Sequence, residues 1–339
     1  MKKKFLHAAL AVVIGAGLTG CLKDSSPADE VVGTSGEVDV YVVGVSDDQA
    51  VYWKNGEMEE LETWGDLKWS YATAIAVSGE DIYIVGNCTD PNYDSHAVYW
   101  KNGRLTRLPE VSEGNNDPDS YAAAIAVSGS DVYIAGYDGD DAVYWKNGKR
   151  TALPVESSAN AACAIAVSGN DVYVSGYDGD DAVYWKNGRK TALPRESEDA
   201  VADAIAVSGS DIHISGREAD GDYEYYVVYW RNGKKTRLSK TPVEMSGTAI
   251  AISGSDVYIA GADGDDAVYW KNGRETKLPC KPGEWASADA ITVYGNDVYV
   301  AGSDGYNPVY WKNGEIEKLG NADEDYYGIA VVPRRQSNQ

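Results

Sequence analysis

Carboxylates and aromatic rings are the side chains in this sequence best suited to catalysis, ion binding or ligand binding. Acidic turns recur along the chain, written YDGDD twice, ADGDD once and VSDD once. Clustered carboxylates suit Ca²⁺, but these turns are short, lack the spacing of an EF-hand loop and contain Asp-Gly, a common turn pair. We interpret them as turns, with weak Ca²⁺ binding as the alternative, and we expect no other cofactor.

Catalysis has a narrower basis. The histidines do not combine with serine and aspartate in a catalytic order, and no phosphate-binding loop or metal-ligand spacing is present. Asp203 and Asp289, together with Asp325, could supply a carboxylate pair for general acid–base chemistry at the mouth of a channel. Such a pair would make the chain a polysaccharide hydrolase or lyase, but the sequence fixes no separation between them. No catalytic residue is therefore assigned.

The elements that position these side chains form a repeat. The hexapeptide VYWKNG, or VYWRNG in one copy, occurs seven times, with its tryptophans at Trp53, Trp100, Trp145, Trp185, Trp230, Trp270 and Trp311. The spacings of 47, 45, 40, 45, 40 and 41 residues are typical of a propeller or a solenoid.

Each repeat predicts four short strands. In the third repeat they are AAAIAV (Ala122–Val127), VYIAG (Val132–Gly136), AVYW (Ala142–Trp145) and KRTALP (Lys149–Pro154). Val, Ile, Tyr and Trp favour strands, and Asn-Gly favours a two-residue type I′ hairpin turn. Because no helical period is sustained, the predicted fold class is all-β.

The chain ends distinguish a ring from a linear array. The first repeat begins at its second strand, DVYVVG (Asp39–Gly44), and the chain ends with an extra first strand, YYGIAVV (Tyr326–Val332). In a ring, the C-terminal strand completes the first blade beside the N-terminal strands. The sequence therefore predicts a seven-bladed β-propeller of four-stranded blades, with the repeated tryptophans packed in its core.

The repeat resembles known families. It shares a late third-strand tryptophan with WD-repeat propellers, but lacks their Gly-His and Trp-Asp dipeptides, so their binding residues are not carried over. VYWKNG is more similar to the HAF-type extracellular repeats and the YWKNG-repeat lipoproteins of bacteria. That resemblance implies a location in the cell envelope and specifies no chemistry.

The N-terminus contains a targeting signal. MKKK precedes the apolar run FLHAALAVVIGAGL, which is short for a membrane span, and Leu18-Thr19-Gly20-Cys21 follows it. This segment resembles the lipobox of bacterial lipoproteins, which implies cleavage before Cys21 and lipid on that residue. We therefore expect a lipid-anchored protein of the bacterial envelope, held at the outer membrane.

These features divide the chain into a signal peptide (1–20), a lipidated cysteine with a flexible tether (21–36), the propeller (37–333) and a tail (334–339). The formal charge of −23 becomes −26 after cleavage, because the signal peptide contains three lysines and no acid. So acidic a chain does not suit nucleic acid, and we expect membrane contact through the acyl chains alone.

Three cysteines remain in the mature chain, namely Cys88, Cys163 and Cys280. At most one pair of them could form a disulfide, and the sequence does not indicate which.

A propeller has two faces that receive different turns. Turns between second and third strands share one face with the loops between blades, and the acidic turns fall there. We call it the acidic face. The turns between third and fourth strands, such as KNGKR and RNGKK, make the opposite face locally basic.

A binding site is expected where one repeat differs in sequence from the other six. The residue before each Ala-Ile pair or its equivalent, expected near the channel mouth, varies through Thr73, Ala123, Cys163, Asp203, Thr248, Asp289 and Tyr327. Extra aromatics lie in loops beside the first blade. The predicted ligand-binding residues are Trp64, Trp69, Trp285, Asp289, Asp323, Asp325 and Tyr326.

Aromatic planes stack on sugar rings while carboxylates accept hydrogen bonds from hydroxyls, and exposed aromatics also anchor protein partners. We therefore expect a binding module for a glycan or a protein, with the polysaccharide enzyme as the alternative. A structural interpretation stays open, in which the aromatics cover the blades and fix long loops.

Overall fold

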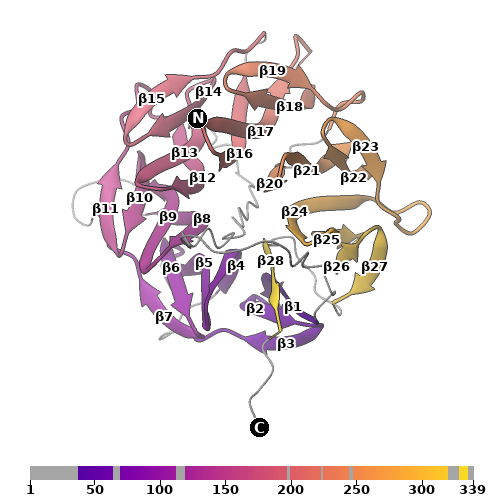
Figure 1. The fold of residues 1–339 in the computed structure, drawn as a ribbon. Coiled ribbons are helices and arrows are strands. Elements are labelled where there is room, and N and C mark those ends of the chain that lie inside the picture. Colours follow the sequence, from indigo (N-terminus) through magenta and orange to yellow (C-terminus); the bar gives the residue numbers. More distant parts are fainter. Residues whose placement is uncertain are drawn as a thin grey trace, which may run out of the picture.

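Seven antiparallel sheets, each of four strands, form a ring around a central axis (Figure 1). The computed structural model describes residues 37–63, 69–111, 119–196, 199–222, 224–243, 247–319 and 328–334. Each sheet is one blade, and its first strand lies nearest the axis. The prediction of an all-β, seven-bladed propeller is confirmed.

The first blade combines one strand from near the C-terminus with three from near the N-terminus. Their order in the sheet is β28 (Gly328–Pro333), β1 (Val38–Ser46), β2 (Gln49–Lys54) and β3 (Glu57–Glu60). The second blade contains β4 (Trp69–Ser78), β5 (Asp81–Thr89), β6 (Ser95–Lys101) and β7 (Arg104–Arg107). The third contains β8 (Ser120–Ser128), β9 (Asp131–Asp138), β10 (Asp141–Lys146) and β11 (Lys149–Ala152).

The remaining blades repeat this order. The fourth contains β12 (Asn160–Ser168), β13 (Asp171–Asp178), β14 (Asp181–Lys186) and β15 (Arg189–Ala192). The fifth contains β16 (Ala200–Ser208), β17 (Asp211–Ala219), β18 (Tyr225–Arg231) and β19 (Lys234–Arg237). The sixth contains β20 (Ala249–Ser253), β21 (Asp256–Asp263), β22 (Asp266–Lys271) and β23 (Arg274–Lys277). The seventh contains β24 (Ala286–Tyr294), β25 (Asp297–Asp304), β26 (Asn307–Lys312) and β27 (Glu315–Lys318).

Strands from both ends of the chain close the ring. β28 pairs antiparallel with β1, and Ile329 lies opposite Val42. Arg334 extends this closure, because its guanidinium donates hydrogen bonds to Asp39 and Glu37, both at 2.8 Å. Figure 1 shows β28 on the axial side of β1 in the first blade.

The KNG part of the repeat forms a hairpin turn that is hydrogen-bonded to the start of the second strand. In the third blade Asn147 and Gly148 have φ of 50° and 75°, as a type I′ turn requires. The Asn147 side chain accepts a hydrogen bond from the Val132 amide and donates one to Asp131, both at 2.8 Å. Lys146 pairs with the same aspartate at 2.8 Å.

This arrangement recurs around the ring and changes the expected charge of the second face. The first basic residue of each turn is paired with an aspartate at the start of the second strand, the first residue of that strand or, for Asp39, the second, so its charge is offset. These pairs join Asp39, Asp81, Asp131, Asp171, Asp211, Asp256 and Asp297 to Lys54, Lys101, Lys146, Lys186, Arg231, Lys271 and Lys312, respectively. The face opposite the acidic one is therefore less basic than the turn sequences predict.

The repeated tryptophans fill the spaces between blades, as predicted. All seven are buried, and most also donate an indole hydrogen bond to a carbonyl in the loop of the preceding blade. Trp185 Nε1, for example, lies 2.9 Å from the Pro154 oxygen. Trp270 differs, because its buried Nε1 has no hydrogen-bond partner and Ser239 stands where that proline would be.

Glycine ends the part of the second strand that recurs in every blade, such as VYIAG, for a steric reason. A Cβ placed on Gly136 would lie 1.8 Å from the carbonyl oxygen of Tyr121 in the first strand. The same close approach occurs at Gly86, Gly176, Gly216 and Gly302. Backbone therefore packs directly on backbone beside a bulge in the first strand, which shifts register between Ala122 and Ala124 in this blade.

Cys88 and Cys163 are buried, Cys280 is half-buried, and all three are free thiols. Within the described ranges, no helix has the length and apolar character needed to cross a membrane. The predicted signal peptide, Cys21 and the tether lie outside the described residues.

Candidate functional site

The predicted ligand-binding residues divide into two groups. Trp69, Trp285 and Asp289 lie in the described part of the structure, and the structure places both tryptophans at the acidic face. Trp64, Asp323, Asp325 and Tyr326 lie outside the described residues. The candidate site is therefore built from Trp69 and Trp285 and from what surrounds them.

Trp69 packs against a tyrosine of its own blade with the two rings tilted. It is the first residue of β4 and lies opposite Thr89 of β5. Its ring centroid is 5.4 Å from that of Tyr93, at an interplanar angle of 48°. Trp69 is 38 % exposed and Tyr93 is 61 % exposed. The pair presents a two-ring aromatic surface to solvent.

The turn between β5 and β6 holds Tyr93 in an unusual conformation. Tyr93 has a φ of 73°, which a bulky residue rarely adopts. Asp90 supports this backbone, because its Oδ1 accepts hydrogen bonds from the amides of Asn92 at 2.8 Å and Asp94 at 3.0 Å. The Tyr93 amide in turn donates to the Asp90 carbonyl at 3.0 Å. Backbone strain of this kind persists where the surroundings impose it.

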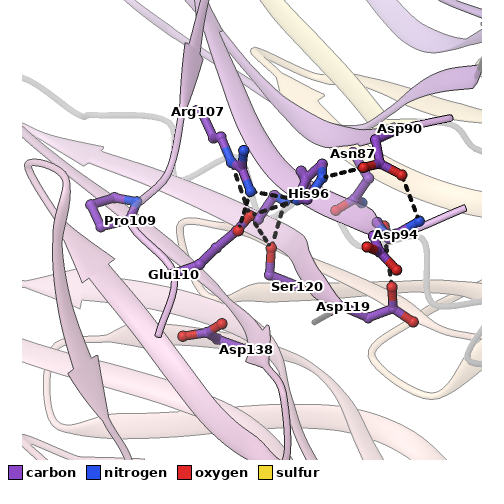
Figure 2. Close-up of polar contacts among 12 residues, drawn as sticks. Asn87, Asp90, Asp94, His96, Arg107, Pro109, Glu110, Asp119, Ser120 and Asp138 are labelled. Carbon is purple, nitrogen blue, oxygen red and sulfur yellow. Dashed lines mark hydrogen bonds and ion pairs between the residues drawn. The ribbon is translucent and has the colours of Figure 1, made fainter. Parts of the chain in front are cut away.

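A buried polar network anchors the base of the same turn (Figure 2). Nδ1 of the buried His96 lies 3.2 Å from Glu110 Oε1 and 2.8 Å from Arg107 Nη2. On its other side, His96 Nε2 lies 3.8 Å from Asp90 Oδ2. Ser120 Oγ donates to Glu110 at 2.7 Å. The network joins the turn, the outer strand of the second blade and the first strand of the third, so it fixes the base from which Tyr93 projects.

A second aromatic pair lies in the seventh blade. Trp285 directly precedes β24, and its ring meets the edge of Tyr306 at 90°, with centroids 5.9 Å apart. Their exposed fractions are 37 % and 71 %. The Gly305 amide donates to the Trp285 carbonyl at 2.8 Å, which ties the turn between β25 and β26 to the loop entering the blade.

Both pairs lie on the acidic face, in the two blades that flank the first blade. Each consists of a tryptophan at the entrance to a first strand and a tyrosine from a turn between second and third strands. Those two positions share one end of every blade. The second and seventh blades flank the first blade in the ring (Figure 1). Four of the six large apolar side chains exposed among the described residues belong to these pairs, so exposed aromatic surface is concentrated here.

The two tryptophans are candidates from the sequence, whereas the tyrosines that they contact are not among the predicted residues. Tyr93 stands in the long turn NCTDPNYDSH, and Tyr306 stands in SDGYN, where other repeats have an aspartate. That second departure from the repeat was a usable signal. The two tryptophans do not stack on one another; each forms its pair within its own blade.

Most of the residues expected near the channel mouth lie at first-strand bulges; Thr248 directly precedes β20, and Tyr327 lies outside the described residues. Thr73, Ala123, Cys163, Asp203 and Thr248 are buried, and Asp289 is half-buried. Thr73 illustrates their role, because its hydroxyl donates to the Ala122 carbonyl of the next blade at 2.7 Å. Ser287 Oγ donates to Asp289 Oδ2 at 2.6 Å. The variable positions thus serve contacts within and between blades.

Asp203 is placed for structure. It is 1 % exposed, lies 3.5 Å from Arg217 Nη1 and accepts a hydrogen bond from the Thr248 amide of the sixth blade at 3.2 Å. Burial raises the pKa of Asp203 to about 6, against the opposing effect of Arg217. Asp289 belongs to the seventh blade, so the sixth blade separates the two carboxylates. This placement gives no support to their acting as one acid–base pair.

The acidic turns use their first carboxylate internally. The buried Asp178 accepts hydrogen bonds from the amides of Glu156 at 2.9 Å and Ser157 at 2.8 Å, and it pairs with Lys190 at 2.6 Å. Asp138 similarly accepts from the Val111 amide at 2.9 Å. These contacts favour the interpretation as structural turns. No group of three or more His, Cys, Asp or Glu in the described ranges is arranged to hold a metal ion.

Comparisons with known proteins identify the fold and no family. No protein-family model matches this sequence, and no curated protein matches it. A "putative 6-phosphogluconolactonase" from Bacteroides uniformis matches in structure at 15% identity with a TM-score of 0.51, covering 87% of this chain and 99% of that one. A protein of the same description from Bacteroides fragilis matches at 12% identity with a TM-score of 0.50, over 87% and 98% of the two chains. At these identities the likeness establishes a shared fold alone.

Proposed function

We propose that this chain is a binding module that holds a glycan on its acidic face, at the exposed tryptophan–tyrosine pairs of the second and seventh blades. One observation carries the proposal: Trp69–Tyr93 and Trp285–Tyr306 expose their rings on one face, in the two blades that flank the closure of the ring. The β-propeller fold itself suggests a binding or interaction module, and it does not specify the ligand.

The geometry of the pairs suits sugar rings. An aromatic face offers a flat apolar surface to the C–H groups of a pyranose, and nearby carboxylates accept hydrogen bonds from its hydroxyls. Because each pair is held by its own turn, little conformational freedom is lost when a ligand stacks on it. A protein ligand would use the same aromatic anchors, and it becomes the preferred class only if no glycan binds.

We further propose that the propeller is displayed from the outer membrane of a bacterial envelope by lipid on Cys21. The support is the LTGC sequence after an apolar run at the N-terminus. A palmitate analogue that labels the wild-type chain and fails to label Cys21→Ser tests this part, and equal labelling of both would contradict it.

A fluorescence titration tests the binding function. The full chain is titrated with a panel of polysaccharides, and a saturable change in tryptophan fluorescence is expected with at least one. Trp69→Ala and Trp285→Ala should each weaken that binding by about tenfold, because a stacked aromatic contributes about 1–2 kcal/mol. The matched control is Met58→Ala, an exposed apolar residue on the outer strand of the first blade. Equal affinity in all three variants would overturn the assignment of the site.

A further inference from the structure

We propose that the glycan bound at the tryptophan–tyrosine pairs is an amino-sugar polymer, recognised through protonated amines. This inference rests on the proposed glycan-binding function and narrows it to one class of ligand. It follows from the carboxylates that the structure places around both aromatic pairs.

Glu284 brings a carboxylate to the second pair. It directly precedes Trp285, and a Cβ placed on Gly305 would lie 3.1 Å from Glu284 Oε2. The carboxylate therefore packs over the turn that carries Tyr306. An amine seated on the Trp285 and Tyr306 rings would find this negative charge beside it.

The first pair has acidic neighbours from two blades. The amide of Ser70, directly after Trp69, donates to the Asp48 carbonyl at 3.0 Å, so the exposed β1–β2 turn with Asp47 and Asp48 lies against the start of β4. Asp94 directly follows Tyr93 in the chain. A ligand on these rings would be approached by carboxylates from the first and second blades.

The balance of charge in these segments favours a cation. Besides the carboxylates used within the turns, the described turns that carry the two pairs, with the adjoining β1–β2 turn, hold the exposed Asp47, Asp48 and Glu284 and the half-buried Asp94, against one basic residue, Lys281. Aromatic faces also attract cations through the ring quadrupole, and tryptophan does so best. A neutral sugar would use the stacking surface alone, whereas a protonated amino sugar would use the rings and the carboxylates together.

Two similar sites in one face suit a ligand that repeats. Each pair joins one tryptophan, one tyrosine and at least one neighbouring carboxylate, on the blades that flank the first blade. A polymer with an amine on every residue can present the same group to both sites, which raises the overall affinity through effective concentration.

Three β-1,4-linked hexasaccharides that differ only at the second carbon of each sugar provide the test. Their substituents there are hydroxyl, N-acetylamino and protonated amino, and each is titrated against the full chain by calorimetry at mildly acidic pH. The amino form should bind about tenfold or more tightly than the other two. Of the three forms, only the amino form should lose affinity steeply as the salt concentration is raised.

Charge-removing variants locate the effect. Glu284→Gln should weaken the amino hexasaccharide severalfold and leave the hydroxyl form unchanged. Asp180→Asn, an exposed aspartate of the acidic face in the fourth blade, serves as the matched control and should change neither. An equal effect of both variants would mean that general charge on the face, and not this site, governs binding.

The possible outcomes separate the inference from the function beneath it. If the hydroxyl or N-acetyl form binds as tightly as the amino form, the inference is overturned and the glycan-binding function stands. If none of the three binds, the inference is overturned, and the glycan-binding function then stands or falls with the polysaccharide panel. If a lysine hexapeptide binds as tightly as the amino hexasaccharide, the ligand is recognised by its charge alone and the glycan class is overturned.

Discussion

At the scale of single residues, two side chains at the same position of the repeat can differ in burial and in hydrogen-bond partners. Asp203 and Asp289 occupy equivalent positions in their blades, yet Asp203 is buried against Arg217 and Thr248 while Asp289 is half-buried and accepts from Ser287. The sequence could identify both as departures from the repeat. It could not indicate their burial, because burial depends on the neighbouring blade.

Asp203 makes stability depend on pH in a definite direction. Its pKa is raised to about 6 in the folded protein from an ordinary value of 3.8, so the folded state favours its protonated form. The stabilisation this provides is full below the unfolded pKa and is lost as pH rises through about 6. The size of the effect is about 3 kcal/mol.

Asp203→Asn should remove that dependence. Urea unfolding followed across this pH interval should show the wild-type chain losing stability relative to the variant as pH rises, whatever the variant's absolute stability. The exposed Asp265→Asn is the control and should track the wild type. A constant difference between wild type and Asp203→Asn at every pH would contradict this account of Asp203.

At the scale of elements, much of the fold could be predicted because its signals are local. Asn-Gly demands a type I′ turn, and Asn147 and Gly148 adopt one. Alternating strand residues and turn residues then set the strand boundaries. The pairing of Lys146 with Asp131 could not be predicted, because the two residues lie at the ends of different strands and meet only when those strands pair. Tyr93 and Tyr306 were missed for a similar reason: only the assembled blade brings each one against its tryptophan.

The indole hydrogen bond that joins neighbouring blades gives a prediction at this scale. Trp185 donates its indole hydrogen bond to the preceding blade, whereas the equally buried Trp270 has no partner for its Nε1. Trp185→Phe should therefore destabilise the protein more than Trp270→Phe, by about 1–2 kcal/mol. Both changes remove similar volume, so each is the control for the other in chemical denaturation. Equal losses of unfolding free energy would show that the hydrogen bond contributes nothing to the interface.

At the scale of the whole molecule, ring closure joins the two ends of the described chain. β28 supplies the axial strand of the first blade and pairs with β1. The apolar side chains of Ile329 and Val331 belong to a buried cluster with Val42 and Trp53. The missing first strand at the N-terminus and the extra one at the C-terminus made this closure predictable from the sequence.

Removing residues 326–339 should therefore open the ring. We expect a large fall in melting temperature, because the first blade loses its axial strand and exposes the buried faces of its neighbours. Removing only residues 335–339, which leaves β28 and Arg334 in place, is the control. If both truncated chains melt at the wild-type temperature, strand closure does not stabilise the ring.

The two aromatic pairs connect these scales. Local turns position the tryptophan and tyrosine side chains, and the circular arrangement of the blades places both pairs on one face, in the blades that flank the first blade. The most direct test is calorimetric titration of the double variant Trp69→Ala/Trp285→Ala with whichever glycan the wild-type chain binds, alongside its melting temperature. We predict that the double variant loses measurable binding and melts within a few degrees of the wild type, because both side chains are partly exposed. Wild-type affinity in a double variant that is folded would show that the site lies elsewhere on the molecule.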